Sequence, residues 1–465
     1  MIIFSIYRMA TRFYSNVEYS NSARGNNDAD VIYYNASIVN NNIANGDPKG
    51  FNGVGQYEDT QVVFNDVRQL PILQNASEYN MSVIRFELAG AGKSLPLFVP
   101  RIVPGQNDIN LTVYNLYMSL VIAEQVSSVT TTRVYEAQAP IMWEPQYRTQ
   151  NNTPSTANPQ QQFGSDYYFC DSYKWWCQLV NATAQALQSD LLAQAVADGV
   201  PLPPNLEEAV TSSSVSGSPA PNLFYNPVTK LFSWSFDAQY WGSGYATSTL
   251  YTPPSSATQY RYGFRMGMDT NLETLLTNFL IFYNDSQTLG GFPPNVNEII
   301  VTPQQIAIDT DPTTGQAYTN PNDGGHVRYV ITQDYESISG NWSPIDSVVI
   351  TTTKLPITPE VVAPAPGTFG NSDNGFNSGT TGAAFQSVIG DVQCGKGGAQ
   401  EWRQYIEYMP NAEYKMMSLG RSQEPINNID MLLWWRCRYD NNLYPLRLYN
   451  GSAVSVKIMF RRKGF

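Results

Sequence analysis

Short runs of alternating polar and apolar residues, most of them closed by Asn, Gly or Pro, recur along the chain. Because successive side chains of a strand point to opposite faces, this alternation predicts strands that bury one face. Aromatic residues reach 13%, and 33 Gly and 30 Pro provide the turns. The predicted early strands cover residues 31–34, 61–64, 81–88, 110–122 and 126–135. We therefore expect a sandwich of antiparallel strands.

Residues 223–236 have the signature of a β-hairpin. Two apolar runs, 223–225 and 231–236, flank the sequence Asn-Pro-Val-Thr-Lys, in which Asn-Pro favours a turn. Serines alternate with aromatic residues in the second run, as in a strand with one buried face.

A second hairpin is predicted near the C-terminus. Strands at 431–439 and 443–448 flank a turn at 440–442, and a further strand at 453–461 follows. Apolar residues alternate along this last strand, so one face is expected to be buried. The residues of that face are Val454, Val456, Ile458 and Phe460.

Two segments have helical rather than β periodicity. The first begins at Asp171, which can cap a helix, and runs to about Ala197, before Gly199 and Pro201. The second, at 271–283, has apolar residues three and four positions apart and is expected to pack one face on the sheets. The sequence thus predicts a mainly β chain with a helical insertion.

We expect this pattern to divide the chain into consecutive segments. They are an N-terminal arm at 1–30, a first β segment at 31–165, a helical insertion with a Pro- and Ser-rich linker at 166–222, a second β segment with a short helix near 271–283 at 223–362, a loop region rich in Gly, Asn and Ser at 363–395, and closing strands with a basic end at 396–465. The strands form either one large or two small β domains.

Charge and composition exclude several classes of function. Charged residues make up only 14% of the chain and the formal net charge is −12, so the surface as a whole is not expected to attract nucleic acid or anionic membranes. No run reaches the roughly 20 apolar residues of a membrane span. The single histidine, His326, cannot form a His pair or a three-His metal site. With only 4 cysteines, we expect reduced, buried thiols rather than a disulfide framework.

Two local motifs suggest phosphate or calcium binding but lack required residues. Glu87 stands where a phosphate-binding loop ending in Gly-Lys-Ser needs its first glycine, so we predict a turn between strands at 90–94. Thr314 stands where a calcium-binding loop beginning at Asp309 needs glycine, and a solvated loop is predicted there. We identify no catalytic residue, metal ligand or cofactor site in the sequence.

Positive charge is concentrated towards the C-terminus. From Arg436 to Phe465 there are seven basic residues against one acid. We expect the final basic cluster to contact a nucleic-acid backbone or an acidic neighbouring protein, and the alternative is a solvated strand end. This cluster consists of Arg461, Arg462 and Lys463.

An ordered series of segments carries a family resemblance. The segments are Ser-Glu-Tyr at 77–79 before Ser-Val-Ile-Arg-Phe at 82–86, Leu-Pro-Leu-Phe-Val-Pro at 95–100, Tyr-Asn-Pro-Val-Thr-Lys-Leu-Phe-Ser at 225–233, Asn-Trp-Ser-Pro at 341–344 before a strand at 348–352 and Leu-Pro at 355–356, and Ser-Val-Lys-Ile-Met-Phe-Arg-Arg-Lys at 455–463. Together they are similar to the minor capsid, or penton-type, proteins of small eukaryotic DNA viruses of the polinton-like and virophage kind. The similarity covers most of the chain, from about Asn35 onwards.

The resemblance implies a β jelly-roll protomer of a viral capsid, located in the virion. Its implied partners are copies of itself, as a pentamer, other capsid proteins, and the genome through the basic C-terminus. Low charge with abundant Tyr suits such contacts, because interface centres are depleted in charge and enriched in aromatic residues. Two other functions stay open: a β-sandwich attachment or glycan-binding module that presents the loop at 363–381, and a carboxylate-based hydrolase. We expect a structural protein rather than an enzyme.

Overall fold

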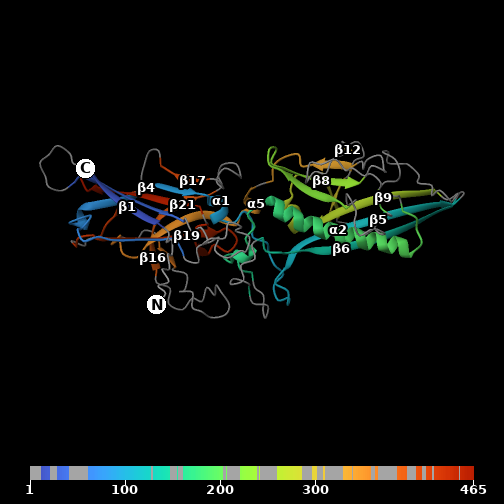
Figure 1. Cartoon of the computed structure of the whole chain (residues 1–465), viewed down its shortest axis with the longest axis horizontal. Helices are drawn as coiled ribbons and strands as arrows, with labels where there is room; N and C mark the ends of the chain where they lie inside the picture. Colours follow the sequence, from blue (N-terminus) through green and yellow to red (C-terminus); the bar gives the residue numbers. More distant parts are fainter. Residues whose placement is uncertain are drawn as a thin grey trace, which may run out of the picture.

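The molecule is elongated and consists of two β-rich halves arranged end to end (Figure 1). The half on the left of the figure is built from strands near both ends of the chain, and the other half from the strands between them. The computed structural model describes residues 12–20, 29–40, 61–126, 129–146, 154, 161–202, 206, 220–237, 240, 259–284, 296–300, 307–308, 328–337, 339–357, 362–364, 385–394, 405–410, 415–420, 424–449 and 451–464.

The first half contains a jelly roll. Its principal strands are β2 (Val31–Val39), β3 (Val63–Val67), β4 (Tyr79–Ala89), β14 (Ile345–Thr352), β16 (Phe385–Gln393), β17 (Tyr405–Tyr408), β19 (Asn428–Cys437) and β21 (Ala453–Arg462). They form four nested antiparallel pairs: β2 with β21, β3 with β19, β4 with β17 and β14 with β16. A long antiparallel ribbon folded over in this way gives two packed sheets, which is the jelly-roll arrangement. The predicted fold class is therefore confirmed.

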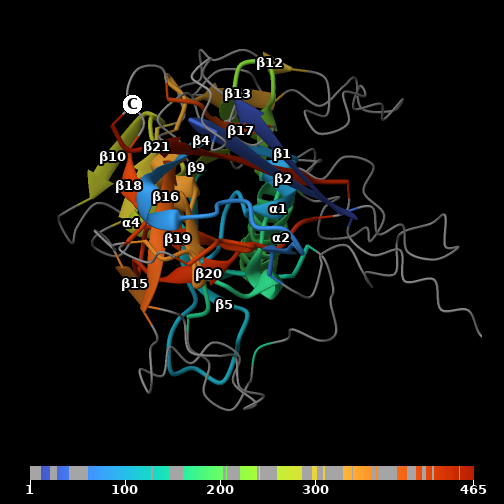
Figure 2. The ribbon, with the colours of Figure 1, turned by 90° about the vertical axis from the view of Figure 1, so that its left-hand side faces the viewer.

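Additional strands extend both sheets of the jelly roll. Strand β1 (Arg12–Ser20) lies within the segment predicted to be an N-terminal arm, and it extends the first sheet to the order β1-β2-β21-β4-β17. Strand β18 (Met417–Ser418) also pairs with β4. The second sheet has the order β15-β16-β14-β19-β20, where β15 is Val362–Pro364 and β20 is Leu443–Pro445. Figure 2 shows this half in front, seen along the long axis.

The burial of β21 confirms its predicted alternation. Val454, Val456, Ile458 and Phe460 are buried, because β21 lies in the middle of its sheet between β2 and β4. The whole length of β2 alternates in the same way. The predicted C-terminal hairpin is confirmed as β19–β20, whereas β21 pairs in the other sheet.

The second half is a separate sandwich, inserted between β4 and β14. Its strands are β5 (Leu111–Val126), β6 (Val129–Met142), β7 (Asn222–Asn226), β8 (Leu231–Asp237), β9 (Gln259–Asp269), β10 (Ile281–Asn284), β11 (Val296–Ile299), β12 (Ala307–Ile308) and β13 (Arg328–Thr332). One sheet has the order β10-β11-β9-β5-β6 and the other β12-β13-β8-β7. The predicted hairpin at 223–236 is confirmed as β7–β8, with the Asn226 side chain accepting hydrogen bonds from two amides of the turn.

Helix α2 (Tyr173–Ala197) packs against β5, β6 and β7. Its Asn181 accepts a hydrogen bond from Leu223 N (2.6 Å) and donates one to Leu223 O (3.0 Å), so the helix satisfies backbone groups of the edge strand β7. The prediction of Asp171 as the helix cap is wrong. Ser172 is the cap, because its backbone is extended and its hydroxyl lies 3.1 Å from the amide of Lys174, from which it accepts.

The predicted helix at 271–283 is wrong beyond its first turns. Helix α4 spans Thr270–Leu275, and the Asp269 side chain caps it by accepting from Leu272 N at 2.9 Å. The backbone then turns at Asn278, where φ is 71°, and continues into β10. The apolar spacing fits a helix, but the Asn278 amide donates to two carbonyls of the loop after β13, and pairing with β11 holds the remaining residues as a strand.

Residues 90–94, predicted as a turn, form one helical turn, α1 (Ala91–Ser94). Gly90 precedes it with φ of +74°, a left-handed conformation that favours glycine. A Cβ at Gly90 would lie 2.5 Å from the hydroxyl oxygen of Ser452, which donates to Gly90 O at 3.3 Å. The glycine therefore permits close contact between α1 and the start of β21.

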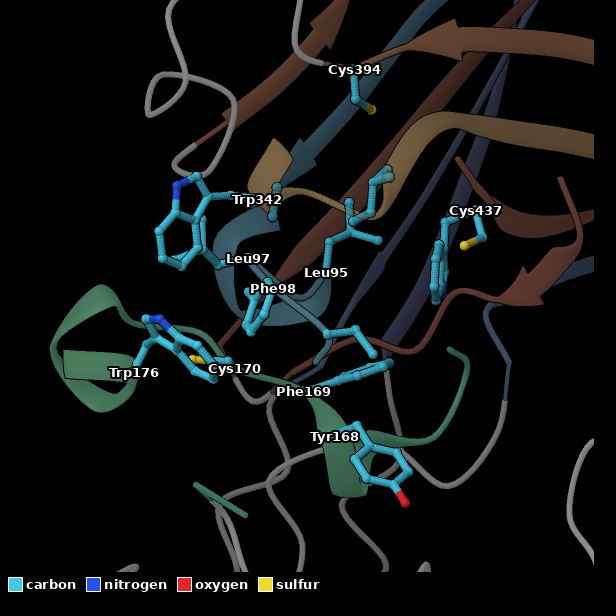
Figure 3. Close-up of a cluster of buried hydrophobic side chains, with 14 of the residues drawn as sticks. Leu95, Leu97, Phe98, Tyr168, Phe169, Cys170, Trp176, Trp342, Cys394 and Cys437 are labelled. Carbon is cyan, nitrogen blue, oxygen red and sulfur yellow. The ribbon is translucent and has the colours of Figure 1, made fainter. Parts of the chain in front are cut away.

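The two halves meet at a cluster of buried rings that we call the aromatic joint, formed by Phe98, Tyr114, Trp176 and Trp342. Figure 3 shows Phe98, Trp176 and Trp342 close together. Phe98 precedes β5, Trp176 belongs to α2, and Trp342 ends the short helix α5 (Ser339–Trp342). The Phe98 ring centroid lies 4.9 Å from that of Trp176, 5.4 Å from Trp342 and 5.9 Å from Tyr114. The segment that connects the jelly roll to β5, the helix α2 and the short helix α5 before β14 therefore pack their aromatic rings in one small core.

The segment before α2 gives a second connection between the halves. Its Cys170 exchanges backbone hydrogen bonds with Phe98, and the ring of Phe163 lies 5.3 Å from that of Tyr439 in the jelly roll. A Cβ at Gly164 would clash with the Tyr444 ring, so a larger residue would displace that ring where this segment crosses β20. The two halves are therefore joined by packing and hydrogen bonds at several points, in addition to the chain segments that connect them.

Candidate assembly surfaces

The structure separates the three residues of the predicted basic cluster. Arg462 donates to Glu78 Oε2 at 2.7 Å, which neutralises its charge. Lys463 is exposed and donates to the carbonyl of Ser77 at 2.7 Å, and Arg461 is exposed near the end of strand β21. Neither has a carboxylate partner among the described residues. The free positive charge at this end of the sheet is thus carried by Arg461 and Lys463.

Other basic residues of the C-terminal segment are also paired with acids. Arg436 lies 3.1 Å from Asp391, and Lys457 lies 3.9 Å from Glu18 while its amine stands over the Tyr33 ring. These carboxylates come from β16 and β1, far away in the sequence. Within the described residues, part of the excess of positive charge in the C-terminal segment is therefore compensated by acids from distant strands.

The first sheet of the jelly roll ends in two open edges. Strand β1 lies at one end of the sheet order and β17 at the other, and neither has a further strand beside it among the described ranges. Open edges present unpaired backbone N–H and C=O groups, which makes them sites for association. No single local motif in the sequence marks these edges, because they follow from long-range pairing.

Exposed apolar side chains occur on β1, on β3 and just after β3, beside one of these edges, and we call this set of residues the β1–β3 flank. Leu70 is 80% exposed, Val67 is 66% exposed and Tyr14 is 53% exposed. The strands are held together here, since Ser15 donates to Asp66 Oδ2 at 2.7 Å. The full flank comprises Phe13, Tyr14, Tyr19, Val63, Val67 and Leu70. The residues do not share one face, because Tyr14 points to the opposite side of β1 from Phe13, whose ring packs on Phe64 of β3. Exposed apolar residues beside an open strand edge nevertheless favour an interaction there.

The described part of the chain contains no constellation that suggests catalysis or metal binding. The cysteines are free and buried as predicted, and burial raises the pKa of Cys394 and of Cys437 to about 12, so both thiols are protonated at neutral pH. No group of His, Cys, Asp or Glu side chains in the described ranges is arranged to hold a metal ion. His326, the acidic loop at 309–315 and residues 365–381 of the predicted presenting loop lie outside the described residues.

Among the described residues, none of the helices has both the length and the apolar character needed to cross a bilayer.

A jelly roll with open sheet edges and an exposed apolar flank is compatible with the shell-forming class of structural proteins, although jelly rolls also occur in lectin domains and cupins. The profile of the family described as Sputnik minor capsid protein V18/19 matches residues 32–462, and the chain belongs to this family. It is accordingly a structural protein of the viral capsid and not an enzyme, and it is located in the virion, where it associates with other capsid proteins.

Individual viral proteins are similar to this chain in sequence or in fold. The chain is 24% identical over 187 residues to the uncharacterized protein V18 of Sputnik virophage, which covers 39% of this chain and 96% of that protein. Its fold is similar to a chain in the cryo-EM structure of the Sputnik virophage, with a TM-score of 0.60 and 20% identity, covering 94% of this chain and 99% of the other. The mavirus penton protein aligns over 93% of this chain and 99% of its own, with a TM-score of 0.46 and 14% identity.

Proposed function

We propose that copies of this capsid protein self-associate into a closed pentamer. The observation that carries the proposal is the presence of two open edges, β1 and β17, in the same sheet of the jelly roll. In a closed ring, each protomer contacts one neighbour through one surface and the other neighbour through a second, different surface. A minor component of a closed icosahedral shell suits its five-fold positions, which are few compared with the remaining positions.

Native mass spectrometry of the full-length protein over a range of concentrations tests this proposal. We expect particles of five copies to replace the monomer as the concentration rises. A protein that stays monomeric at every concentration, or that forms particles with another fixed number of copies, contradicts the pentamer. Electron micrographs of assembled shells that contain the protein provide the second readout, and we expect it at the vertices.

We also propose that Arg461 and Lys463 contact an acidic neighbouring protein of the shell rather than the genome. Support comes from the small number of free cations at this end of β21, since Arg462 is neutralised by Glu78. Tight binding to DNA uses many phosphate contacts and depends steeply on salt. Two free cations suit a local contact with a protein carboxylate better than a track along a nucleic-acid backbone.

The double variant R461Q/K463Q tests the C-terminal contact, with Arg462→Gln as the matched control. We expect the double variant to enter assembled particles less efficiently than the wild type and the control, while none of the three proteins is retained on a DNA column at physiological salt. Salt-dependent retention of the wild type on DNA, lost in the double variant, would instead favour a genome contact. Normal incorporation of the double variant would show that this end of β21 is simply solvated.

A further inference from the structure

The two open edges of the first jelly-roll sheet lie at the same height along the strands. Following the residue pairing across the sheet, Tyr14 of β1 pairs with Ser37, Ser37 with Ser455, Ser455 with Glu87, and Glu87 with Glu407 of β17. The four residues of β17 therefore stand level with the first four residues of β1. The edges are separated by four strand spacings, about 19 Å.

The two edges also run in the same direction. Each neighbouring pair in the order β1-β2-β21-β4-β17 is antiparallel, so β1 and β17 are parallel to each other. Rotation about an axis parallel to the strands changes neither the height nor the direction of a strand. Such a rotation brings the β17 edge of one copy beside the β1 edge of the next, whereas a two-fold axis perpendicular to the strands would reverse one of them.

The surfaces beside the two edges suit a contact between proteins. The β1–β3 flank carries the exposed apolar residues described above, and at the other edge Met409 is 56% exposed and Tyr405 is 42% exposed. Glu407 stands directly across from Glu87, and it has no cation within ion-pair distance among the described residues. Exposed apolar area and two like charges opposite each other are unfavourable in free energy. A neighbouring protein can cover the apolar area and provide a cation for the carboxylate.

We propose that the β1–β3 flank of one copy packs against the β17 edge of the next copy, so that the first sheet continues from protomer to protomer. The inference rests on the self-association proposed above and assigns its surface. The occupant is a second copy because the matching height and direction relate two edges of one chain. A different partner at either edge would require no such match. The contact is heterologous, and repeated rotation closes it into a ring.

Two single substitutions in the full-length protein test the assignment. Tyr14→Asp places a carboxylate on the β1–β3 flank, and Met409→Asp places one beside the β17 edge. Both sites are more than half exposed in the protomer, so the fold should tolerate the change. The control is Val228→Asp, at an 88% exposed position in the β7–β8 turn of the other half. Sedimentation velocity measures the assembly, and circular dichroism checks the fold.

We expect each edge variant to need a concentration at least about tenfold higher than the wild type for assembly, because burying an unpaired carboxylate is costly. The Val228→Asp control should assemble as the wild type does. An equimolar mixture of the two edge variants should give dimers and no rings, because a single intact junction can form between an unmodified β1–β3 flank and an unmodified β17 edge. This dimer also shows that both variants are folded.

The outcomes separate this inference from the self-association itself. If the wild type assembles and both edge variants assemble equally well, the assigned surface is wrong while self-association stands. If the edge variants are monomeric and their mixture stays monomeric, the contact is not heterologous and the inference fails. A wild type that never assembles overturns both.

Discussion

Replacement of Phe98 by alanine tests the aromatic joint between the two halves. The Phe98 side chain is 1% exposed, and its ring centroid lies between 4.9 and 5.9 Å from those of Trp176, Trp342 and Tyr114. Truncating a buried Phe costs about 3–5 kcal/mol in free energy of unfolding. Three ring contacts are lost, and the neighbouring rings are packed too tightly to move into the cavity. We therefore expect the free energy of unfolding to fall by about 4 kcal/mol or more.

Urea denaturation followed by both tryptophan fluorescence and far-UV circular dichroism measures this loss. The matched control is Phe282→Ala, since Phe282 is 50% exposed and its truncation should cost about 1 kcal/mol or less. Because the joint fastens both halves, both probes should move to lower urea concentration in Phe98→Ala. An equal loss in the two variants, or a shift of one probe alone, would refute the reasoning that the joint couples the halves.

Two further predictions concern α2 and the buried thiols. Asn181→Ala removes both hydrogen bonds to the backbone of Leu223 and should lower the free energy of unfolding by about 2 kcal/mol, measured by urea denaturation; an unchanged midpoint would contradict the edge-capping role. Burial raises the pKa of Cys394 and Cys437 to about 12, so their reactivity with iodoacetamide, followed by mass spectrometry, should be negligible in the folded protein at mildly alkaline pH and should appear on unfolding. Rapid labelling of either thiol in the folded protein would disprove its protection.

Local sequence patterns predicted those elements whose environment is uniform along their length. Strand β21 and helix α2 follow their expected periodicity, because each buries one continuous face. The segment after Leu275 departs from expectation because its apolar residues serve two elements, a short helix and the strand β10. The spacing of apolar residues does not show which element each residue belongs to, nor that each is buried, since Leu280 is 53% exposed.

The assembly surfaces were less accessible to sequence reasoning. A count of charges identifies the basic C-terminal segment, but it cannot show that Arg462 is paired with Glu78, a residue 384 positions earlier. The β1–β3 flank likewise unites two strands whose contact depends on nested, long-range pairing. The resemblance to capsid proteins anticipated the role of the chain, while the surfaces that perform this role required the fold.

The position of β21 between β2 and β4 sets an order of events during synthesis. The side chain of Asn40, just after β2, donates to the carbonyl of Leu448, just before β21, across a sequence separation of 408 residues. The central strand of the sheet therefore leaves the ribosome long after its two neighbours. We expect the inserted half, whose strand pairings are shorter in range, to fold first, and the jelly roll to close around β21 afterwards. Until β21 is made, β2 and β4 lack the strand that joins them, so we expect β1 and β17 to take up their positions in one sheet only after translation is complete.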